Sequence, residues 1–415
     1  MATELQTLAL DDLDVSNPGL FENDEWQDSF KRLRQDSPLH YCEHSPNGPY
    51  WSATTHETIM AIDKNHHDFS SEIGGITIAS RPPPSDDSKL ENMRSFIDMD
   101  EPEHTAHRRT VAPAVASSNL AKLEPLIRER VIDILENLPI GEDFNWVEQV
   151  SVELTARMLA TLFDFPYEER HKLIYWSDIA TRVPSITGKD SDLEERRAAL
   201  RDCMETFHEL WQARATQPPK FDLVSMMAHG EDTRSLADNP ALFLGNMILL
   251  IIGGNDTTRN TISGGVVAFN QYPAEFQKLR SHPNLLPNAV AEIIRWQTPL
   301  IHMRRTALTD VDVAGKRIRK GDNVVMWYLS GNRDETVFDH PDQLVVDRRN
   351  ARQHVSFGFG IHRCMGNRLA EMQVRVLWEE ILKRFKHIEL VGDITRLRSN
   401  FVRGLVNVPV RLHPL

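Results

Sequence analysis

The stretch FGFGIHRCMG, residues 357–366, decides how the rest of this sequence is interpreted. Three glycines, Gly358, Gly360 and Gly366, surround Cys364, and glycine lets a backbone turn tightly or approach a bulky partner closely. An apolar pattern at helical spacing follows at once, so Cys364 is expected near a helix N-terminus, whose dipole favours a thiolate. A thiolate suits a soft metal ion. The alternative is a glycine turn that contains an incidental cysteine.

The same residues fit the pattern F-x-x-G-x-[HR]-x-C-x-G and resemble the haem-binding loop of cytochromes P450. In that family the cysteine thiolate is the axial ligand of the haem iron and promotes cleavage of the O–O bond. The resemblance implies that Cys364 binds the iron of haem b and that Phe357 packs on the thiolate side. It also implies that His362 hydrogen-bonds a propionate and that Gly366 belongs to the haem-binding loop.

A second motif, Glu292-Ile293-Ile294-Arg295, resembles the E-x-x-R of the family's K helix. Positions i and i+3 share a helix face, so the two charged side chains can interact. Alone this motif is no more than an ordinary surface ion pair. Arg348 stands nine residues before Phe357, where the family places the arginine that completes a buried network. We expect Glu292, Arg295 and Arg348 to be structural.

A third motif, GGNDTT at residues 253–258, resembles the oxygen-activation motif of the family's long central helix. Two glycines inside a helix cost about 1 kcal/mol each relative to alanine, so something is expected to pack closely against this backbone, which by resemblance is haem and dioxygen. Asp256 and Thr257 form an adjacent acid–alcohol pair suited to delivering protons. The alternative is a loop, because this composition is also good turn chemistry.

Three basic residues resemble those that bind the haem propionates in the family. His104 and Arg108 form an H-x-x-x-R pattern whose side chains face the same way on a helix, and arginine can hold a carboxylate through two bonds. Arg305 resembles the propionate arginine that follows the K helix, although its neighbour Arg304 is only one residue away. The rival interpretation makes His104 and His107 metal ligands.

The resemblance covers residues 20–412, with the signatures in the family's order. It implies a monooxygenase that uses dioxygen, two electrons and two protons to convert R–H into R–OH and water, with Asp256 and Thr257 relaying protons. A peroxide-driven enzyme would not need this acid–alcohol pair. A non-enzymatic haem sensor or carrier is the alternative of another class.

Apolar spacing predicts a mainly helical fold with a minor β region, and the resemblance makes it a cytochrome P450 fold in one domain over residues 1–415. Helices are expected over residues 120–138, over 154–163 and from residue 366 onward. Residues 311–328 alternate and turn twice, which predicts a small antiparallel ribbon, and residues 50–54 are a further candidate strand. The triple proline within residues 81–89 predicts a long loop.

Composition excludes several classes of protein. The net charge of −13 argues against nucleic acid as the main partner. The three cysteines, Cys42, Cys203 and Cys364, lie too far apart for a zinc ribbon or a disulfide framework. The N-terminal residues resemble no secretory signal, and the most apolar run, residues 247–252, is far too short to span a membrane. We therefore expect a cytoplasmic monomer without a membrane anchor.

Electrons are expected to come from a separate protein, because the sequence contains no flavin or nicotinamide fingerprint and no fused reductase. Between residues 348 and 370 the sequence has five arginines and no acidic residue: Arg348, Arg349, Arg352, Arg363 and Arg368. A basic face, to which Arg109 can add, suits an acidic partner, although some of these arginines can be buried or bound to propionate. Resemblance to soluble bacterial members implies a two-iron ferredoxin and a flavin-dependent ferredoxin reductase.

The substrate is expected to be apolar. Residues 69–79 and 398–412 resemble the bacterial branch that hydroxylates alkanes and fatty acids at the terminal carbon. An apolar lining equally fits a terpene or a steroid, and Arg403 is a possible anchor for a fatty-acid carboxylate. The expected substrate-binding residues are Ile76, Ile78, Leu249, Leu250, Gly253, Leu300, Met303, Phe401 and Val402.

Overall fold

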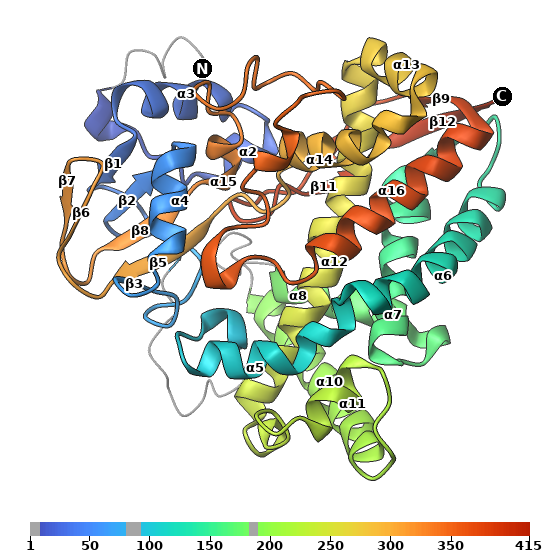
Figure 1. The fold of residues 1–415 in the computed structure, drawn as a ribbon, viewed down its shortest axis with the longest axis horizontal. Coiled ribbons are helices and arrows are strands. Elements are labelled where there is room, and N and C mark those ends of the chain that lie inside the picture. Colours follow the sequence, from blue (N-terminus) through green and yellow to red (C-terminus); the bar gives the residue numbers. More distant parts are fainter. Residues whose placement is uncertain (1–8, 80–92, 182–189) are drawn as a thin grey trace.

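The computed structural model describes residues 9–79, 93–181 and 190–415, and helices dominate it (Figure 1). The expected loop at residues 81–89 lies outside the described residues. The N-terminal half contains α2 (Pro18–Glu22), α3 (Gln27–Asp36), α4 (His56–Lys64), α5 (Glu103–Val111), α6 (Ser117–Glu136), α7 (Glu153–Phe163), α8 (His171–Thr181) and α10 (Asp190–Ala215). The C-terminal half contains α11 (Leu223–His229), α12 (Pro240–Gln271), α13 (Pro273–Ser281), α14 (Leu286–Gln297), α15 (Tyr328–Gly331) and α16 (Asn367–Arg384).

The β region is divided into small sheets. Strands β1 (Leu39–Cys42), β2 (Tyr50–Ala53), β8 (Asn323–Met326), β5 (Met303–Ala307) and β3 (Phe69–Ser70) form one sheet in that order. A second sheet has the order β4 (Asp143–Asn145), β12 (Pro409–Pro414) and β9 (Phe385–Leu390). Two pairs remain: β6 (Val311–Val313) with β7 (Lys316–Ile318), and β10 (Thr395–Arg396) with β11 (Leu405–Asn407).

Helix α12 passes through the middle of the molecule (Figure 1) and belongs to two hydrophobic clusters. Its first half, from Phe243 to Ile251, packs with α7, α8, α10 and α11, and its second half, from Ile262 to Phe269, packs with α6, α14 and α16. The helix is long and apolar enough to resemble a membrane span, but most of its apolar window is buried in these clusters. We therefore describe it as a core helix.

The expected fold class is confirmed, and so are the helices expected around residues 120–138 and 154–163 and after residue 366. Residues 253–258 are helical rather than a loop. The expected ribbon over residues 311–328 is only partly correct. Strands β6 and β7 pair, with Ala314 and Gly315 at positive φ between them, but β8 leaves them to pair with β2 and β5. Strand β8 is buried between β2 and β5, and this burial outweighs the local alternation of apolar and polar residues that predicted a single ribbon.

Candidate active site

The cysteine loop precedes α16 and lies between α4 and α12 in Figure 1. Gly358 and Gly360 have φ values of 65° and 68°, in the left-handed region that glycine tolerates. A Cβ on Gly360 would lie 2.4 Å from the Asp63 carbonyl oxygen, so the loop also approaches α4 too closely for a side chain. The Cys364 N–H donates to the Phe357 carbonyl at 2.8 Å, which closes the loop.

Solvent reaches Cys364, and the rest of the loop from Phe357 to Gly366 is partly buried or exposed. Burial raises the pKa of its thiol, while the N–H groups of Gly366 and Asn367 and the charges of Arg108 and Arg363 lower it. The amides at the helix terminus favour a thiolate, as expected, but desolvation acts in the opposite direction and is the larger effect. A bound metal ion would displace the thiol proton, because the thiolate is the form that ligates a metal.

A group of cationic and neutral basic side chains lies beside this loop. The rings of His104 and His362 are 4.1 Å apart between centroids, and buried nitrogens on both, Nε2 of His104 and Nδ1 of His362, have no partner. Burial and the charges of Arg305, His104 and Arg108 lower the pKa of His362 to about 2. Anionic groups would satisfy these nitrogens and relieve the repulsion, so the residues fit the two propionates of a haem.

The two neighbouring arginines have different tasks. Arg305 donates to the Asp63 carboxylate at 2.8 Å, and Asp63 also accepts from the Tyr328 hydroxyl at 2.9 Å and from the Phe359 N–H at 2.8 Å. Asp63 thus ties Arg305 to the cysteine loop. Sequence reasoning missed it, since nothing in the local pattern near the end of α4 distinguishes it from a surface aspartate. Arg304 instead lies against residues 73–76.

The metal-site alternative for His104 and His107 finds no support. No group of residues suited to hold a metal ion occurs within the described parts of the chain. Burial lowers the pKa of both histidines, and His104 faces His362 rather than a carboxylate cluster.

The two glycines of α12 differ in their surroundings. A Cβ on Gly254 would lie 2.7 Å from the Leu159 side chain of α7, so this glycine permits close helix packing. A Cβ on Gly253 would meet nothing within 4 Å, and Gly253 is exposed in the middle of a core helix. The expectation that both glycines leave room for haem and dioxygen is therefore not met for Gly254. Only Gly253 faces open space.

Asp256 and Thr257 are adjacent but point in different directions, because successive helix positions are about 100° apart. Asp256 is buried and pairs with Arg259 at 2.8 Å, and Arg259 pairs with Asp178 of α8 at 2.7 Å. Burial raises the pKa of Asp256 to about 6, and one of its oxygens has no partner. The Thr257 hydroxyl donates to the Gly253 carbonyl at 3.2 Å, on the open side of the helix. Sequence reasoning missed Arg259 and Asp178.

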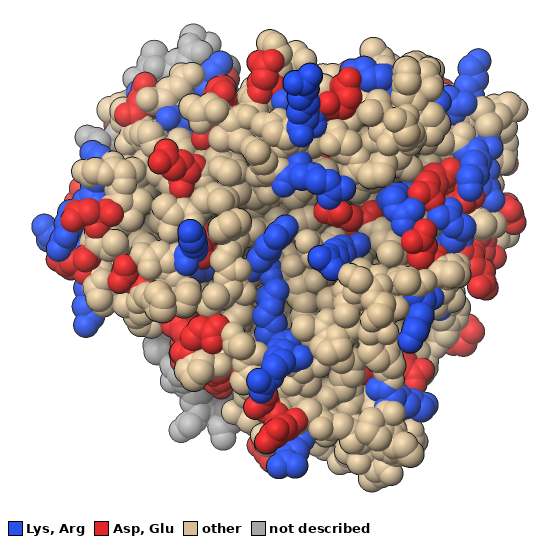
Figure 2. Space-filling model, viewed as in Figure 1, with Lys and Arg blue, Asp and Glu red and all other residues tan. Residues whose placement is uncertain are grey.

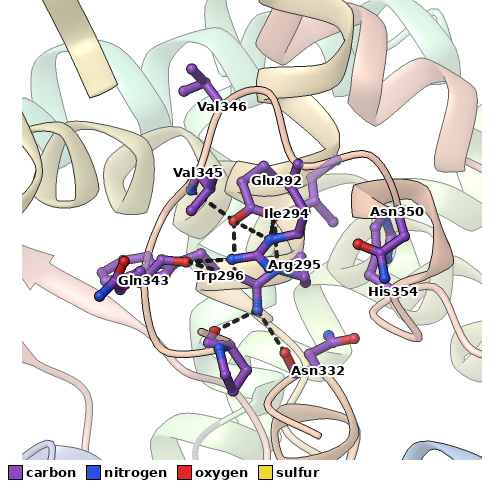
Figure 3. A network of polar contacts seen from close by, with 12 residues as sticks. Glu292, Ile294, Arg295, Trp296, Asn332, Gln343, Val345, Val346, Asn350 and His354 are labelled. Carbon is purple, nitrogen blue, oxygen red and sulfur yellow. Dashed lines mark hydrogen bonds and ion pairs between the residues drawn. The ribbon is translucent and has the colours of Figure 1, made fainter. Parts of the chain in front are cut away.

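The charged trio predicted from sequence comes together in the interior, and Figure 3 shows Glu292 and Arg295 with their backbone partners. Glu292 accepts from Arg295 at 2.7 and 2.8 Å and from the Arg348 Nε at 3.0 Å. Arg295 also donates to the carbonyls of Asn332 and Gln343. The two arginines bring one more charge than Glu292 neutralises, and backbone carbonyls from the segment before the cysteine loop accept their remaining hydrogens.

The expected substrate-binding residues fall into two groups. The partly exposed ones are Ile76, Leu249, Leu250, Leu300, Met303 and Phe401, together with exposed Gly253. Ile78 and Val402 are instead buried, and Ile78 belongs to a core cluster with Trp327. Both lie near the partly exposed residues: Val402 forms a β-bridge with Leu300, and Ile78 is two residues from Ile76, whose carbonyl accepts from the Arg304 N–H at 2.7 Å.

Lysine and arginine side chains run down the middle of the face that Figure 2 shows, the face on which the cysteine loop lies in Figure 1. Arg348 does not belong to this surface, since Glu292 holds it in the interior. Arg109 pairs with Asp232 and Arg352 with Glu371. Of the arginines between residues 348 and 370, the exposed ones for which no ion pair occurs among the described residues are Arg349, Arg363 and Arg368.

Comparisons with known proteins agree with this geometry. The family model Cytochrome P450 matches residues 131–412. Linalool 8-monooxygenase of Pseudomonas putida is 36% identical over 97% of this chain and 99% of its own length. The structure of Cytochrome P450-153 from Novosphingobium aromaticivorans has a TM-score of 0.90 and 43% identity, covering 97% of this chain and 99% of that one. CYP153D17 from Sphingomonas sp. PAMC 26605 has a TM-score of 0.91 and 44% identity, covering 97% and 100%.

Proposed function

Because this chain belongs to the cytochrome P450 family and is a monooxygenase, we propose that it hydroxylates linear hydrocarbon chains, mainly at the terminal carbon. The family binds haem, oxidises apolar substrates and depends on redox partners. One oxygen atom of dioxygen enters a C–H bond, and the other leaves as water after two electrons and two protons are taken up. When bound, haem b supplies the activation of dioxygen.

The residues of this chain would bind and orient the haem and would move protons toward it. Cys364 offers the sulfur ligand, directed by the amides of Gly366 and Asn367. The propionates would be held by His104, Arg108, Arg305 and His362, with Phe357 on the thiolate side. Asp256 would carry protons inward from Asp178, which is partly exposed, through rotation of the Asp256–Arg259 pair. Thr257, on the open side of α12, would hold the proton-donating hydroxyl.

One observation carries the proposal of an apolar chain. Positions 249, 253 and 257 lie one helical turn apart on α12, and Leu249, Gly253 and Thr257 are all accessible there while most of this helix is buried. This strip begins at Leu249, passes Gly253, which faces open space, and ends at the Thr257 hydroxyl. A hydrocarbon laid along it would present one end near Thr257.

Two further observations bear on the choice between alkanes, fatty acids, terpenes and steroids. Arg403, the candidate anchor for a carboxylate, is buried and donates to Asp24 at 3.2 Å and to the carbonyls of Trp296 and Gln297, so it is already occupied. The relative from Pseudomonas putida acts, by its name, on carbon 8 of linalool, which is the end of an acyclic terpene chain. A terpene with a linear end is therefore the second candidate, ahead of a rigid steroid.

A series of n-alkanes and fatty acids of increasing length tests the substrate proposal. Each buried CH₂ contributes about 0.8 kcal/mol, so affinity should rise about fourfold per carbon until the channel is full. The measurements are the substrate-induced spectral shift and the position of the hydroxyl group in each product. Exclusive subterminal products, or tight binding of rigid polycyclic ligands alone, would contradict the proposal and leave the monooxygenase assignment intact.

Replacing Asp256 with asparagine should lower turnover about 100-fold, since a positioned proton carrier contributes at least that much. The pKa of Asp256 is raised to about 6, so its protonated fraction falls as pH rises above 6. If proton delivery limits turnover, the turnover of the parent should fall as pH rises through this range. The turnover of Asp256→Asn should not depend on pH in this way.

The matched variant is Asp178→Asn. The charge of Asp178 raises the pKa of Asp256, so its removal should move the inflection of turnover against pH to lower values. The measurement is product formed per minute between pH 5 and 8 at saturating reductant. An unchanged inflection in Asp256→Asn would remove this residue from the proton route.

For the electron donor we propose a two-iron ferredoxin that docks on the basic face around Cys364. A flavin-dependent reductase would reduce this ferredoxin. The basic face consists of Arg109, Arg349, Arg352, Arg363 and Arg368, all exposed in a chain whose net charge is −13. Positive charge gathered there would attract an acidic protein and orient it. We further propose a single cytoplasmic domain that meets this partner in solution.

Arg368→Glu should slow reduction by such a ferredoxin about tenfold at low salt, with little effect on substrate binding. Arg368 contacts the neutral Ser117 hydroxyl at 2.7 Å, whereas Arg109 and Arg352 already pair with acids, so we expect their glutamate variants to have smaller effects. Arg317→Glu, on the β6–β7 hairpin at the far edge of Figure 1, is the control. The measurement is the rate of reduction by stopped flow. If the rate of the parent does not change with salt concentration, the ferredoxin docks on another face.

A further inference from the structure

His302 joins three chain segments from which the proposed substrate pocket is built. It lies between Leu300 and Met303 and is fully buried. Its Nε2 accepts a hydrogen bond from the Ile78 N–H at 2.9 Å, and its Nδ1 contacts the Asn400 carbonyl at 2.9 Å. Residues 73–78, called here the 73–78 loop, are thereby linked to the turn that carries Phe401.

The protonation state of the His302 ring follows from these partners. A backbone N–H can only donate, so Nε2 carries no proton, and Nδ1 must carry one to donate to the Asn400 carbonyl. Burial lowers the pKa of His302 to about 4, which keeps the ring neutral at pH 7. The ring lies edge-on to Trp327 and Phe401, at 5.0 and 5.4 Å between centroids, so its orientation is fixed.

Neighbouring contacts extend the same connection. His302 and Arg304 are two residues apart in an extended segment, so they face the same side, toward the 73–78 loop. Arg304 N–H donates to the Ile76 carbonyl at 2.7 Å, and its side chain donates to the carbonyls of Gly75 and Ile73. A Cβ on Gly74 would lie 2.0 Å from the Arg304 guanidinium, so this glycine lets the loop close over the arginine.

The residue before His302 also contacts the turn that carries Phe401: the Ile301 N–H donates to the Phe401 carbonyl at 2.8 Å. Both partners of the His302 ring are thus backbone groups of segments that carry expected pocket residues, Ile76 on one side and Phe401 on the other. A histidine that served core packing alone would need neither bond, because the ring contacts to Trp327 and Phe401 require only an aromatic side chain.

We propose that His302 is a positioning residue that determines specificity: by bonding Ile78 and Asn400 it fixes the 73–78 loop relative to the Phe401 turn and so sets which carbon of the substrate is presented for oxidation. This inference rests on the proposed function for the identity of the substrate. The loop itself contributes Ile76, and its anchor Ile78 is sunk in the core cluster.

The test compares His302→Phe, which keeps an aromatic ring but loses both hydrogen bonds, with His302→Gln, which can keep one acceptor and one donor. Exchange of the Ile78 amide should be about tenfold faster in the phenylalanine variant, as expected for the loss of one hydrogen bond. The ratio of terminal to subterminal products from n-dodecane and dodecanoic acid should fall in His302→Phe and recover partly in His302→Gln. His282→Phe, at an exposed histidine, should change neither.

Haem content and the carbon monoxide spectrum of the reduced protein should stay at parent values, while KM rises. If His302→Phe does not fold, His302→Gln alone must still shift the product ratio in the same direction. An unchanged product ratio and an unchanged exchange rate at Ile78 would show that the residue only packs, and would overturn the inference.

If the parent oxidises neither chain, the substrate proposal fails, and the inference is tested with iron ligands instead. Binding of imidazole, which is too small to reach the loop, should stay unchanged in His302→Phe, and binding of 4-phenylimidazole should weaken. Equal affinity of parent and variant for 4-phenylimidazole would then overturn the inference.

Discussion

Replacing Cys364 with histidine is expected to abolish both hydroxylation and the red-shifted Soret band that reduced cytochromes P450 show under carbon monoxide. Histidine can still coordinate iron but is a neutral ligand, so it cannot push electron density toward bound oxygen as a thiolate does. The loop offers its thiol to open space, with two backbone amides directed at the sulfur. The measurement is the carbon monoxide difference spectrum of haem-loaded protein.

Cys203→Ala is the matched control, because Cys203 is fully buried in the cluster around α10. Its removal should cost some stability and leave the spectrum unchanged. A red-shifted band that survives in Cys364→His would mean that another residue binds the iron, and the interpretation of the loop would be wrong.

Replacing Glu292 with glutamine should prevent accumulation of folded, haem-loaded protein. Glu292, Arg295 and Arg348 are buried, and the only carboxylate of the trio faces both arginines. Removing one partner of a buried ion pair costs about 3–5 kcal/mol because the remaining charge is left uncompensated. That loss is a large part of the roughly 5–15 kcal/mol by which proteins of ordinary stability stay folded.

The control is Glu379→Gln, which breaks the partly exposed pair of Glu379 with Arg128 between α6 and α16. Solvent screens that pair, so the expected cost is below about 1 kcal/mol. Urea unfolding followed by circular dichroism, together with the ratio of haem to protein absorbance, gives both results. Parent-like stability of Glu292→Gln would show that backbone carbonyls alone can hold the two arginines.

Much of the site could be predicted from sequence because its parts are local. The turn around Cys364 depends on glycines within a few residues of it, and a pair such as Glu292 and Arg295 meets because helix geometry brings positions i and i+3 together. Adjacency in sequence is a weaker guide to adjacency in space. Asp256 and Thr257 are neighbours in the chain, yet α12 directs one into the protein and the other toward open space.

Desolvation was a second limit of sequence reasoning. The residue types around Cys364 suggest a lowered pKa, but the pKa is raised because burial outweighs nearby charges and amides. The pKa depends on how much protein surrounds the thiol, which no short sequence window contains. For Arg348, by contrast, the expected burial against Glu292 is met, and it removes this arginine from the basic face.

By itself the sequence determined the family, the glycine-bounded cysteine loop and the helical core, since each depends on residue types and spacings along the chain. Only the tertiary structure decided which of two adjacent arginines reaches the cysteine loop, because Asp63, 242 residues earlier, selects Arg305. It likewise decided that His302 bonds Ile78 and Asn400. The reason is that hydrogen bonds between distant segments are fixed by how the elements pack, and a strand's alternating faces acquire different partners only once the chain has folded around them.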